Sequence, residues 1–386
     1  MRIFLEPTES LLFRTGRPFD AGESSYAESI FPPTPETLQG AMRAAIATHW
    51  DTTKTFEELF EDPDLVDRIG DRNNYGRFRI TSIALGRRKN DNEHKIERLF
   101  PPPAHLLKDE EGTILRLRPQ PMNSVKSIMQ EKADDGTIKT VPYNMHYLIP
   151  DPTTKTKGKL KPITGWLTEE SLYQVLQATP DLSRLEVVSL HNIFVREPRV
   201  GIGMQNTTKT TQEGLLYQVQ MIRMCPNYGF VLDVRLSTKP DNDDFVEDGQ
   251  TQRELCLPSE GWVTLGGERR AAYFEVIAPS TYEQGVSVEG NKKGTLLYIA
   301  TPTYFEKGWQ PSLWPNSINP IAAVVDRYKP IGGWLLGTGN SGGTQKLVRR
   351  CVPEGSVYFF DQSISQPLTN FGSHIGYGIA YAGEWK

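Results

Sequence analysis

The residues best suited to bind a ligand lie in a segment near the start of the chain that contains arginine, glutamine and glycine. Its candidate residues are Arg14, Arg17, Gln39, Gly40 and Arg43. A glycine inside a helix costs about 1 kcal/mol relative to alanine, so close approach by a strand or a ligand would explain Gly40. The arginines and the glutamine would surround that approach with hydrogen-bond donors. The residues leave an alternative equally open, in which Gly40 serves helix–sheet packing and the arginines are solvated.

A second basic segment combines charge, glycine and side-chain hydroxyl groups. Its candidate residues are Arg196, Arg199, Gly201, Gly203, Gln205 and Lys209. A loop of this composition presents both cationic side chains and backbone N–H groups to phosphates. No Gly-Lys-Ser/Thr triplet follows, so the segment is not a P-loop. The alternative interpretation is the tip of a β-hairpin that binds nothing.

A third segment, from Gly332 to Lys346, is rich in glycine and contains the string GTGNSG, which satisfies GxGxxG. A dinucleotide-binding fingerprint must follow a strand and open a helix. Residues 346–352 have a strand-like pattern instead, so we reject a dinucleotide site and expect a glycine-rich loop. Another short glycine turn begins at Gly266. The basic residues beside these two loops are Arg269, Arg270, Lys346 and Arg349.

The sequence offers little for catalysis or metal binding. Its 6 histidines show neither HExxH nor HxH spacing, and no GxSxG string occurs. Its 3 cysteines form no CxxC pair, so neither a disulfide framework nor a cysteine zinc site is supported. We therefore expect no catalytic residue, no metal and no cofactor.

Composition limits the class of protein. The 43 Lys and Arg residues against 47 Asp and Glu give a formal net charge of −4, so a nucleic-acid role must rest on local patches. The 33 glycines and 28 prolines are spread along the chain, which favours short elements and tight turns over a helical bundle. No run approaches the roughly 18 apolar residues of a membrane span, and the N-terminus lacks the order of a signal peptide. We expect a cytoplasmic protein without membrane contact.

The elements that would position these residues form an α+β pattern. A helix is expected from the N-cap Thr34 to about Trp50, because apolar residues recur at helical spacing. A second helix is expected over residues 56–70 and another after Thr168. Strands dominate from Arg184 onward. The polar, proline-dotted stretch of residues 86–162 is expected to form functional loops or to be disordered.

Five strings together resemble a known family, the third subunits of the Cmr complex. That complex is the type III-B CRISPR effector, and its third subunit is a RAMP protein. The matching strings are FRTGRPFDAGE, FPPTPETLQGAMRAAI, EPRVGIGMQNTTKTTQEGLLYQVQMIRM, WVTLGGERRAAYFE and FGSHIGYGIAYAGEW. The resemblance implies two ferredoxin-like, RRM-related domains with long inserted loops. Residues 1–190, with an insertion at about 86–162, would form the first, and residues 191–386, with the glycine-rich loop, the second.

The resemblance also implies a function. It suggests a non-catalytic subunit that binds the five-prime tag of the CRISPR RNA (crRNA) and docks the large polymerase-like subunit. A neighbouring RAMP backbone subunit would be a further partner. By this resemblance, the first set of candidate residues lies near the RNA groove and the second set in a central loop motif.

Two other functions stay open at this level. RAMP relatives include endoribonucleases that process CRISPR precursor RNA with a histidine as general acid or base, and His49 or His191 would be that residue here. A nucleotide-dependent enzyme that uses the loop at residues 332–343 ranks last.

Overall fold

Strands outweigh helices in the protein, which confirms a mixed α and β class. The computed structural model describes residues 1–14, 26–71, 74–90, 93–132, 138–151, 154–204, 207–208, 210–240, 244–278, 294–311, 319–335, 343–362 and 369–385. The two ferredoxin-like domains remain a proposal. No helix among these residues is long and apolar enough to cross a membrane.

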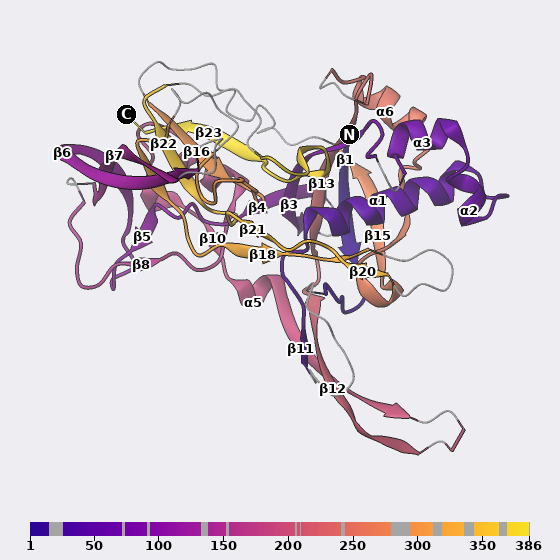
Figure 1. Ribbon diagram of the computed structural model, residues 1–386. Coiled ribbons are helices and arrows are strands. Elements are labelled where there is room, and N and C mark those ends of the chain that lie inside the picture. The colour runs from indigo at the N-terminus through magenta and orange to yellow at the C-terminus, as the bar shows by residue number, and fades with distance from the viewer. Residues whose placement is uncertain are drawn as a thin grey trace.

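An antiparallel sheet of eight strands forms the centre of the fold (Figure 1). In spatial order the strands are β10 (Val187–Val188), β9 (Trp166–Thr168), β4 (Glu93–Phe100), β3 (Phe78–Asn90), β13 (Tyr228–Leu236), β1 (Arg2–Pro7), β15 (Ala271–Ile277) and β14 (Glu260–Thr264). Strands from both sides of residue 190 share this sheet, so main-chain hydrogen bonds join the two predicted halves. This shared sheet does not mark a domain boundary at residue 190, and the division there stays a prediction.

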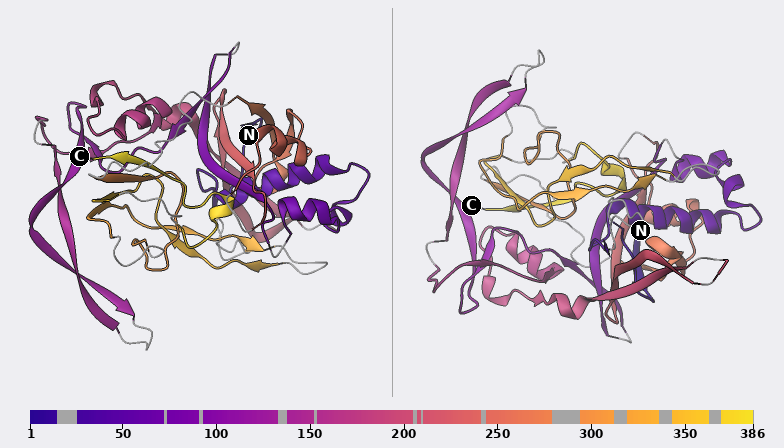
Figure 2. Two further views of the ribbon diagram at one scale, coloured as in Figure 1. Left: turned by 90° about the horizontal axis from the view of Figure 1, so that it is seen from above. Right: turned by 60° about the horizontal axis from the view of Figure 1, so that its bottom comes forward.

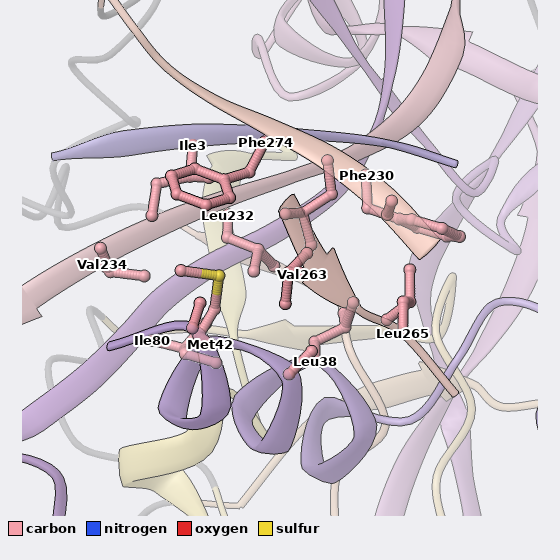
Figure 3. Packing of buried hydrophobic residues seen from close by; sticks show 14 of the residues in the cluster. Ile3, Leu38, Met42, Ile80, Phe230, Leu232, Val234, Val263, Leu265 and Phe274 are labelled. Carbon is pink, nitrogen blue, oxygen red and sulfur yellow. The ribbon is translucent and has the colours of Figure 1, made fainter. Parts of the chain in front are cut away.

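Helix α1 (Pro35–Trp50) covers one face of this sheet and forms the main core with it. The Thr34 side chain accepts a hydrogen bond from the Thr37 N–H, as the predicted N-cap requires. Leu38 and Met42 point from α1 toward Val263 and Phe274 on the sheet (Figure 3). Burying a side chain of this size contributes about 1.5–3 kcal/mol.

The remaining helices are short. The single helix expected over residues 56–70 is instead two, because Asp62 caps a new helix that begins at Pro63. The other α-helices are α2 (Phe56–Leu59), α3 (Pro63–Ile69), α4 (Glu169–Val175), α5 (Leu190–Ile193) and α6 (Asp248–Glu254). The 3₁₀ turns are η1 (Leu182–Arg184), η2 (Gly267–Arg269) and η3 (Ser373–Ile375).

A second core lies under a four-stranded sheet near the C-terminus. Its strands are β17 (Ala322–Val324), β22 (Val357–Phe360), β16 (Thr295–Ile299) and β23 (Ala380–Glu384). Phe100 from β4 and Leu172 from α4 pack into this core, so it is continuous with the central sheet. Two-stranded ribbons follow the same part of the chain, namely β18 (Lys329–Ile331) with β21 (Arg349–Cys351) and β19 (Trp334–Leu335) with β20 (Thr344–Gln345).

The expectation of loops or disorder over residues 86–162 is wrong, because most of this stretch is strand. Beyond β3 and β4 it contains β5 (Leu106–Lys108), β6 (Ile114–Lys132), β7 (Ile138–Pro150) and β8 (Lys161–Pro162). Strands β6 and β7 form a long twisted hairpin that projects from the body (Figure 2). The sequence of this stretch lacks the sustained alternation of apolar and polar residues by which strands are recognised.

A buried ion network ties the central sheet to α4. The Arg98 guanidinium donates to the Glu169 carboxylate and, at 3.3 Å, to Asp233. Asp233 also accepts two hydrogen bonds from Arg2, at 2.6 and 2.8 Å. Beside this network, Ser82 is hydrogen-bonded to Tyr381 of β23 at 3.0 Å. The network therefore lies where the two cores meet.

His105 is fully buried beside Phe359, and neither of its ring nitrogens has a hydrogen-bond partner within the described part of the chain. Burial, with a smaller contribution from Arg116, lowers the pKa of His105 from 6.5 to about 3. Between these values the unfolded chain binds a proton that the folded chain does not, so stability is lost as pH falls below 6.5.

We expect His105→Leu to remove this part of the acid sensitivity. The parent chain should lose about 2 kcal/mol more unfolding free energy than the variant between pH 7 and pH 5. Urea unfolding at both pH values measures the difference, with His191→Leu at an exposed histidine as the control. Equal losses in the parent and the His105 variant would contradict the expectation.

Candidate functional site

The base of a second projecting hairpin brings several of the candidate arginines together. This hairpin pairs β11 (Phe194–Met204) with β12 (Thr211–Met224) (Figure 1), and β2 (Tyr26–Glu28) lies parallel to β12. Arg199 donates to Ser10 at 2.7 Å, and Arg270 donates to Glu9 at 2.8 Å. Arginines from two distant motifs thus meet at adjacent residues of the N-terminal segment.

Glu9 is the acceptor at the centre of this arrangement. It accepts a 3.0 Å hydrogen bond from the Ala271 N–H in addition to the bond from Arg270. The Ala271 N–H and the Arg270 guanidinium lower the pKa of the Glu9 carboxyl, and Arg199 adds to the effect. The ionised carboxylate orients Arg270, while Ser10 and Glu197 hold Arg199.

The first motif reaches the same surface through its main chain. The main chain of Arg14 forms an isolated antiparallel β-bridge with Ser29, and the Arg14 side chain is exposed. Arg196 donates to Gln220 at 2.7 Å and lies 3.4 Å from Glu28, and it is 41% exposed. Arg14 and Arg196 are therefore both open to solvent near β2.

The glycine turn at Gly266 holds Arg269 and Arg270 at this surface. Gly266 has φ +78°, and a Cβ there would lie 2.6 Å from the Leu12 carbonyl oxygen, so only glycine fits. The Gly267 N–H donates to the same carbonyl at 2.8 Å. Arg269 is exposed. The turn therefore packs directly against the segment that precedes Arg14.

The β11–β12 hairpin has one apolar, solvent-exposed face. The pairing register places four exposed side chains on it, which we call the apolar face: Tyr26, Val200, Ile202 and Leu216. On the opposite face Tyr217 lies across Gly201, where a Cβ would come within 2.2 Å of the tyrosine ring. Glu197 accepts from both Arg199 and Arg223 on that side. The outer part of the apolar face is thus apolar, Arg196 lies on the same face at the hairpin base, and the opposite face carries Tyr217 with Arg199 and Arg223.

The C-terminal ribbon and α1 form a second candidate surface. Lys346 lies 3.5 Å from Glu36 in the first turn of α1, and the Arg349 guanidinium lies 3.5 Å from the centre of the Phe371 ring. Gly40 is exposed one helical turn after Glu36, and no described atom outside the backbone of its own helix lies within 4 Å of a Cβ built there. Packing inside the described chain therefore does not account for Gly40.

Gln39 and Arg43 face inward from α1. Gln39 is 6% exposed, and its Nε2 has no hydrogen-bond partner among the described residues. Arg43 donates to the carbonyl oxygens of Gly70 at 2.8 Å and Asp71 at 3.1 Å. Burial lowers the pKa of Arg43. These contacts give Arg43 a role in holding the end of α3.

We therefore expect Arg43→Ala to act on stability. Loss of two charged hydrogen bonds, with two carbonyl groups left without their donor, should lower the unfolding free energy by about 2–4 kcal/mol. The matched control, Arg196→Ala on the exposed hairpin base, should cost less than about 1 kcal/mol. Urea unfolding of both variants measures the difference, and equal losses would contradict the placement of Arg43.

The structure changes the interpretation of the second basic segment. The segment from Arg196 to Lys209 was interpreted as a phosphate-binding loop, with the tip of a β-hairpin as the alternative; residues 194–204 are strand β11 of a hairpin, so Gly201 and Gly203 are strand residues. Arg17, Gln205 and Lys209 lie outside the described residues. Sequence reasoning missed Arg223, Tyr217 and the apolar face. The alternation of Val200 and Ile202 was the available signal, and the intervening glycines obscured it.

The two histidines considered for catalysis have different surroundings. His49 Nδ1 lies 2.8 Å from the Ala45 carbonyl oxygen, and its ring packs edge-on against Phe274. His191 is exposed in α5, and its carbonyl accepts from Cys225. Within the described ranges no group of three His, Cys, Asp or Glu side chains could hold a metal ion.

Comparison with known proteins shows to which family the chain belongs. The family model described as CRISPR-associated protein (Cas_Cmr3) matches residues 3–385, so the chain belongs to this family. The resemblance to third subunits of the Cmr complex is thereby confirmed. No curated protein matches the chain.

Two solved structures are similar to the chain over most of its length. One is a chain of the type III-B Cmr-beta complex bound to cognate target RNA and AMPPnP, in state 1. It shares 16% identity, with 94% of this chain and 86% of that chain covered at a TM-score of 0.48. The other is from Cmr-beta bound to cognate target RNA, with 15% identity, coverage of 93% and 86%, and a TM-score of 0.44.

Proposed function

We propose that the protein is a non-catalytic, crRNA-binding subunit of a type III-B CRISPR effector in the cytoplasm. It would hold the five-prime tag of the crRNA, dock the large polymerase-like subunit and contact a neighbouring RAMP backbone subunit. The observation that carries the RNA-binding role is the convergence of arginines from three separate motifs at the base of one projecting hairpin.

The charge of this hairpin base favours phosphates. Among the described residues, six arginines outnumber four glutamates there. The residues are Arg14, Arg196, Arg199, Arg223, Arg269 and Arg270, with Glu9, Glu28, Glu197 and Glu268. The carboxylates hold the guanidinium groups in place, and the surplus positive charge remains for an RNA backbone.

The apolar face supplies the second half of single-stranded RNA recognition. Unpaired bases are usually bound by stacking on aromatic or apolar side chains while basic groups follow the backbone. Ile202 and Leu216 lie next to each other on the apolar face, and Tyr217 lies on the other side. RNA that wraps around the hairpin would meet Arg196 and the apolar side chains on one face, and Tyr217, Arg199 and Arg223 on the other.

The α1 surface extends this path in our proposal. Gly40 is open to solvent one helical turn after Glu36, which pairs with Lys346, so a ligand backbone can come close to the helix there. Gln39 lies beside Gly40 in the sequence, with an Nε2 that no described residue accepts from. We place a secondary contact of the RNA, or of a partner subunit, at this position.

Copurification tests the proposed function. The tagged full chain, expressed with its own CRISPR locus, should recover short RNAs that share one five-prime sequence, together with one much larger protein. Recovery of neither would contradict the proposal. Specific, metal-independent cleavage of repeat RNA by the purified chain, lost in a His49 or His191 variant, would establish the endoribonuclease instead.

A further inference from the structure

The face of the central sheet turned away from α1 carries an exposed aromatic pair at its edge. Trp262 of β14 is 61% exposed and lies opposite Tyr273 of β15, with ring centres 5.4 Å apart. The Tyr273 hydroxyl donates to the Glu260 carboxylate. Neighbouring Val263 points the other way into the core with α1, so the alternation of β14 fixes Trp262 and Glu260 on the open face.

The same face already holds one cation within the chain. Arg88 lies 5.4 Å from the centre of the Phe4 ring and donates to both Glu6 and Glu275. A guanidinium over an aromatic ring and between carboxylates is a favourable arrangement, worth about 0.5–2 kcal/mol for the ring contact alone. Arg88 therefore shows how this sheet face binds a cationic side chain.

The edge of the sheet at β14 and β15 has the same combination of an aromatic ring and carboxylates, but no described cationic side chain lies between them. In the register, Tyr273 lies between Glu6 and Trp262, and Glu275 lies between Phe4 and Glu260. No cationic side chain among the described residues lies over the Trp262 ring or pairs with Glu260. An aromatic ring and a carboxylate are thus exposed side by side.

Strand β14 is also the last strand of the sheet. Within the described ranges it pairs with β15 on one side only. An edge strand can accept an extended segment of another chain through main-chain hydrogen bonds, with alternate side chains reaching the same face.

We propose that this edge docks an extended, basic segment of a protein partner, with an arginine or lysine side chain held between Trp262 and Glu260. Charge decides for such a partner over RNA, because three carboxylates at this edge of the face, Glu6, Glu260 and Glu275, stand against one described guanidinium, that of Arg88, while Arg2 farther along β1 is held by Asp233. This surface is distinct from the hairpin, and the inference does not rest on the proposed RNA-binding function.

Binding of labelled peptides to the full chain tests the inference. The probe is a fluorescein-labelled peptide of alternating arginine and threonine, followed by anisotropy. Trp262→Ala and Glu260→Gln should each weaken binding about tenfold. The matched controls, Tyr147→Ala and Glu306→Gln, change an exposed aromatic residue and an exposed carboxylate elsewhere and should leave the affinity unchanged.

Three results would overturn the inference. The first is absence of peptide binding, or equal binding by the parent and both edge variants. The second is equal affinity for a peptide with glutamate in place of arginine. The third is a loss of oligouridine affinity in Trp262→Ala, which would assign this face to RNA. Urea unfolding of each variant distinguishes loss of binding from loss of fold.

Discussion

Arg98→Met is expected to lower the unfolding free energy of the protein by about 3–5 kcal/mol. The substitution removes the guanidinium that Glu169 and Asp233 share, so the buried Glu169 carboxylate loses this cation while Asp233 keeps Arg2. Removing one member of a buried ion pair costs more than the pair contributes, because the remaining charge stays desolvated. The network also lies between the two cores, so the loss should affect both.

Urea unfolding followed by circular dichroism measures this loss. The control is Lys157→Met, which removes an exposed pair with Glu111 and should cost less than about 1 kcal/mol. A loss for Arg98→Met as small as that of the control would show that the network does not stabilise the fold.

Ile202→Asp combined with Leu216→Asp is expected to weaken RNA binding by at least about 100-fold. Each substitution removes an apolar contact for a base, worth about 1–3 kcal/mol, and places a negative charge in the path of the backbone. Both side chains are largely exposed, so the fold should keep its stability. The probe is a labelled RNA that carries the five-prime tag of the organism's own crRNA.

Two controls make this result specific to the apolar face. Ile202→Phe keeps an apolar contact and should retain the parent affinity. Tyr147→Asp adds the same charge on the β6–β7 hairpin and should have little effect. An unchanged affinity of the double variant would show that RNA does not cross the apolar face.

Local signals in the sequence were sufficient for α1 but not for the hairpins. Thr34 and the apolar spacing that follows it predicted α1 almost to the residue, because a cap and its periodicity lie within one short window. Residues 198–204 were interpreted first as a loop, with a β-hairpin only as the alternative, because glycines at alternate positions look like a flexible loop. The structure shows instead that Gly201 accommodates the Tyr217 ring.

The site depends on pairing that no local pattern encodes. Arg199 meets Ser10, and Arg270 meets Glu9, only because β11, β15 and the N-terminal segment come together in the folded sheets. Arg43 shows the converse, since its motif suggested a ligand contact and its guanidinium binds the end of α3. Residue type identified the basic groups, and tertiary structure decides which of them remain at the surface.

The salt dependence of RNA binding tests the central claim, that the hairpin base binds the RNA backbone. The slope of the logarithm of affinity against the logarithm of salt concentration reports the number of phosphate contacts, at about 0.7 per contact for a single strand. We predict that Arg199→Gln combined with Arg223→Gln lowers this slope by about 1.4 for the tag RNA, while Lys157→Gln leaves it unchanged. A slope and an affinity that are the same in the double variant and the parent would contradict the account.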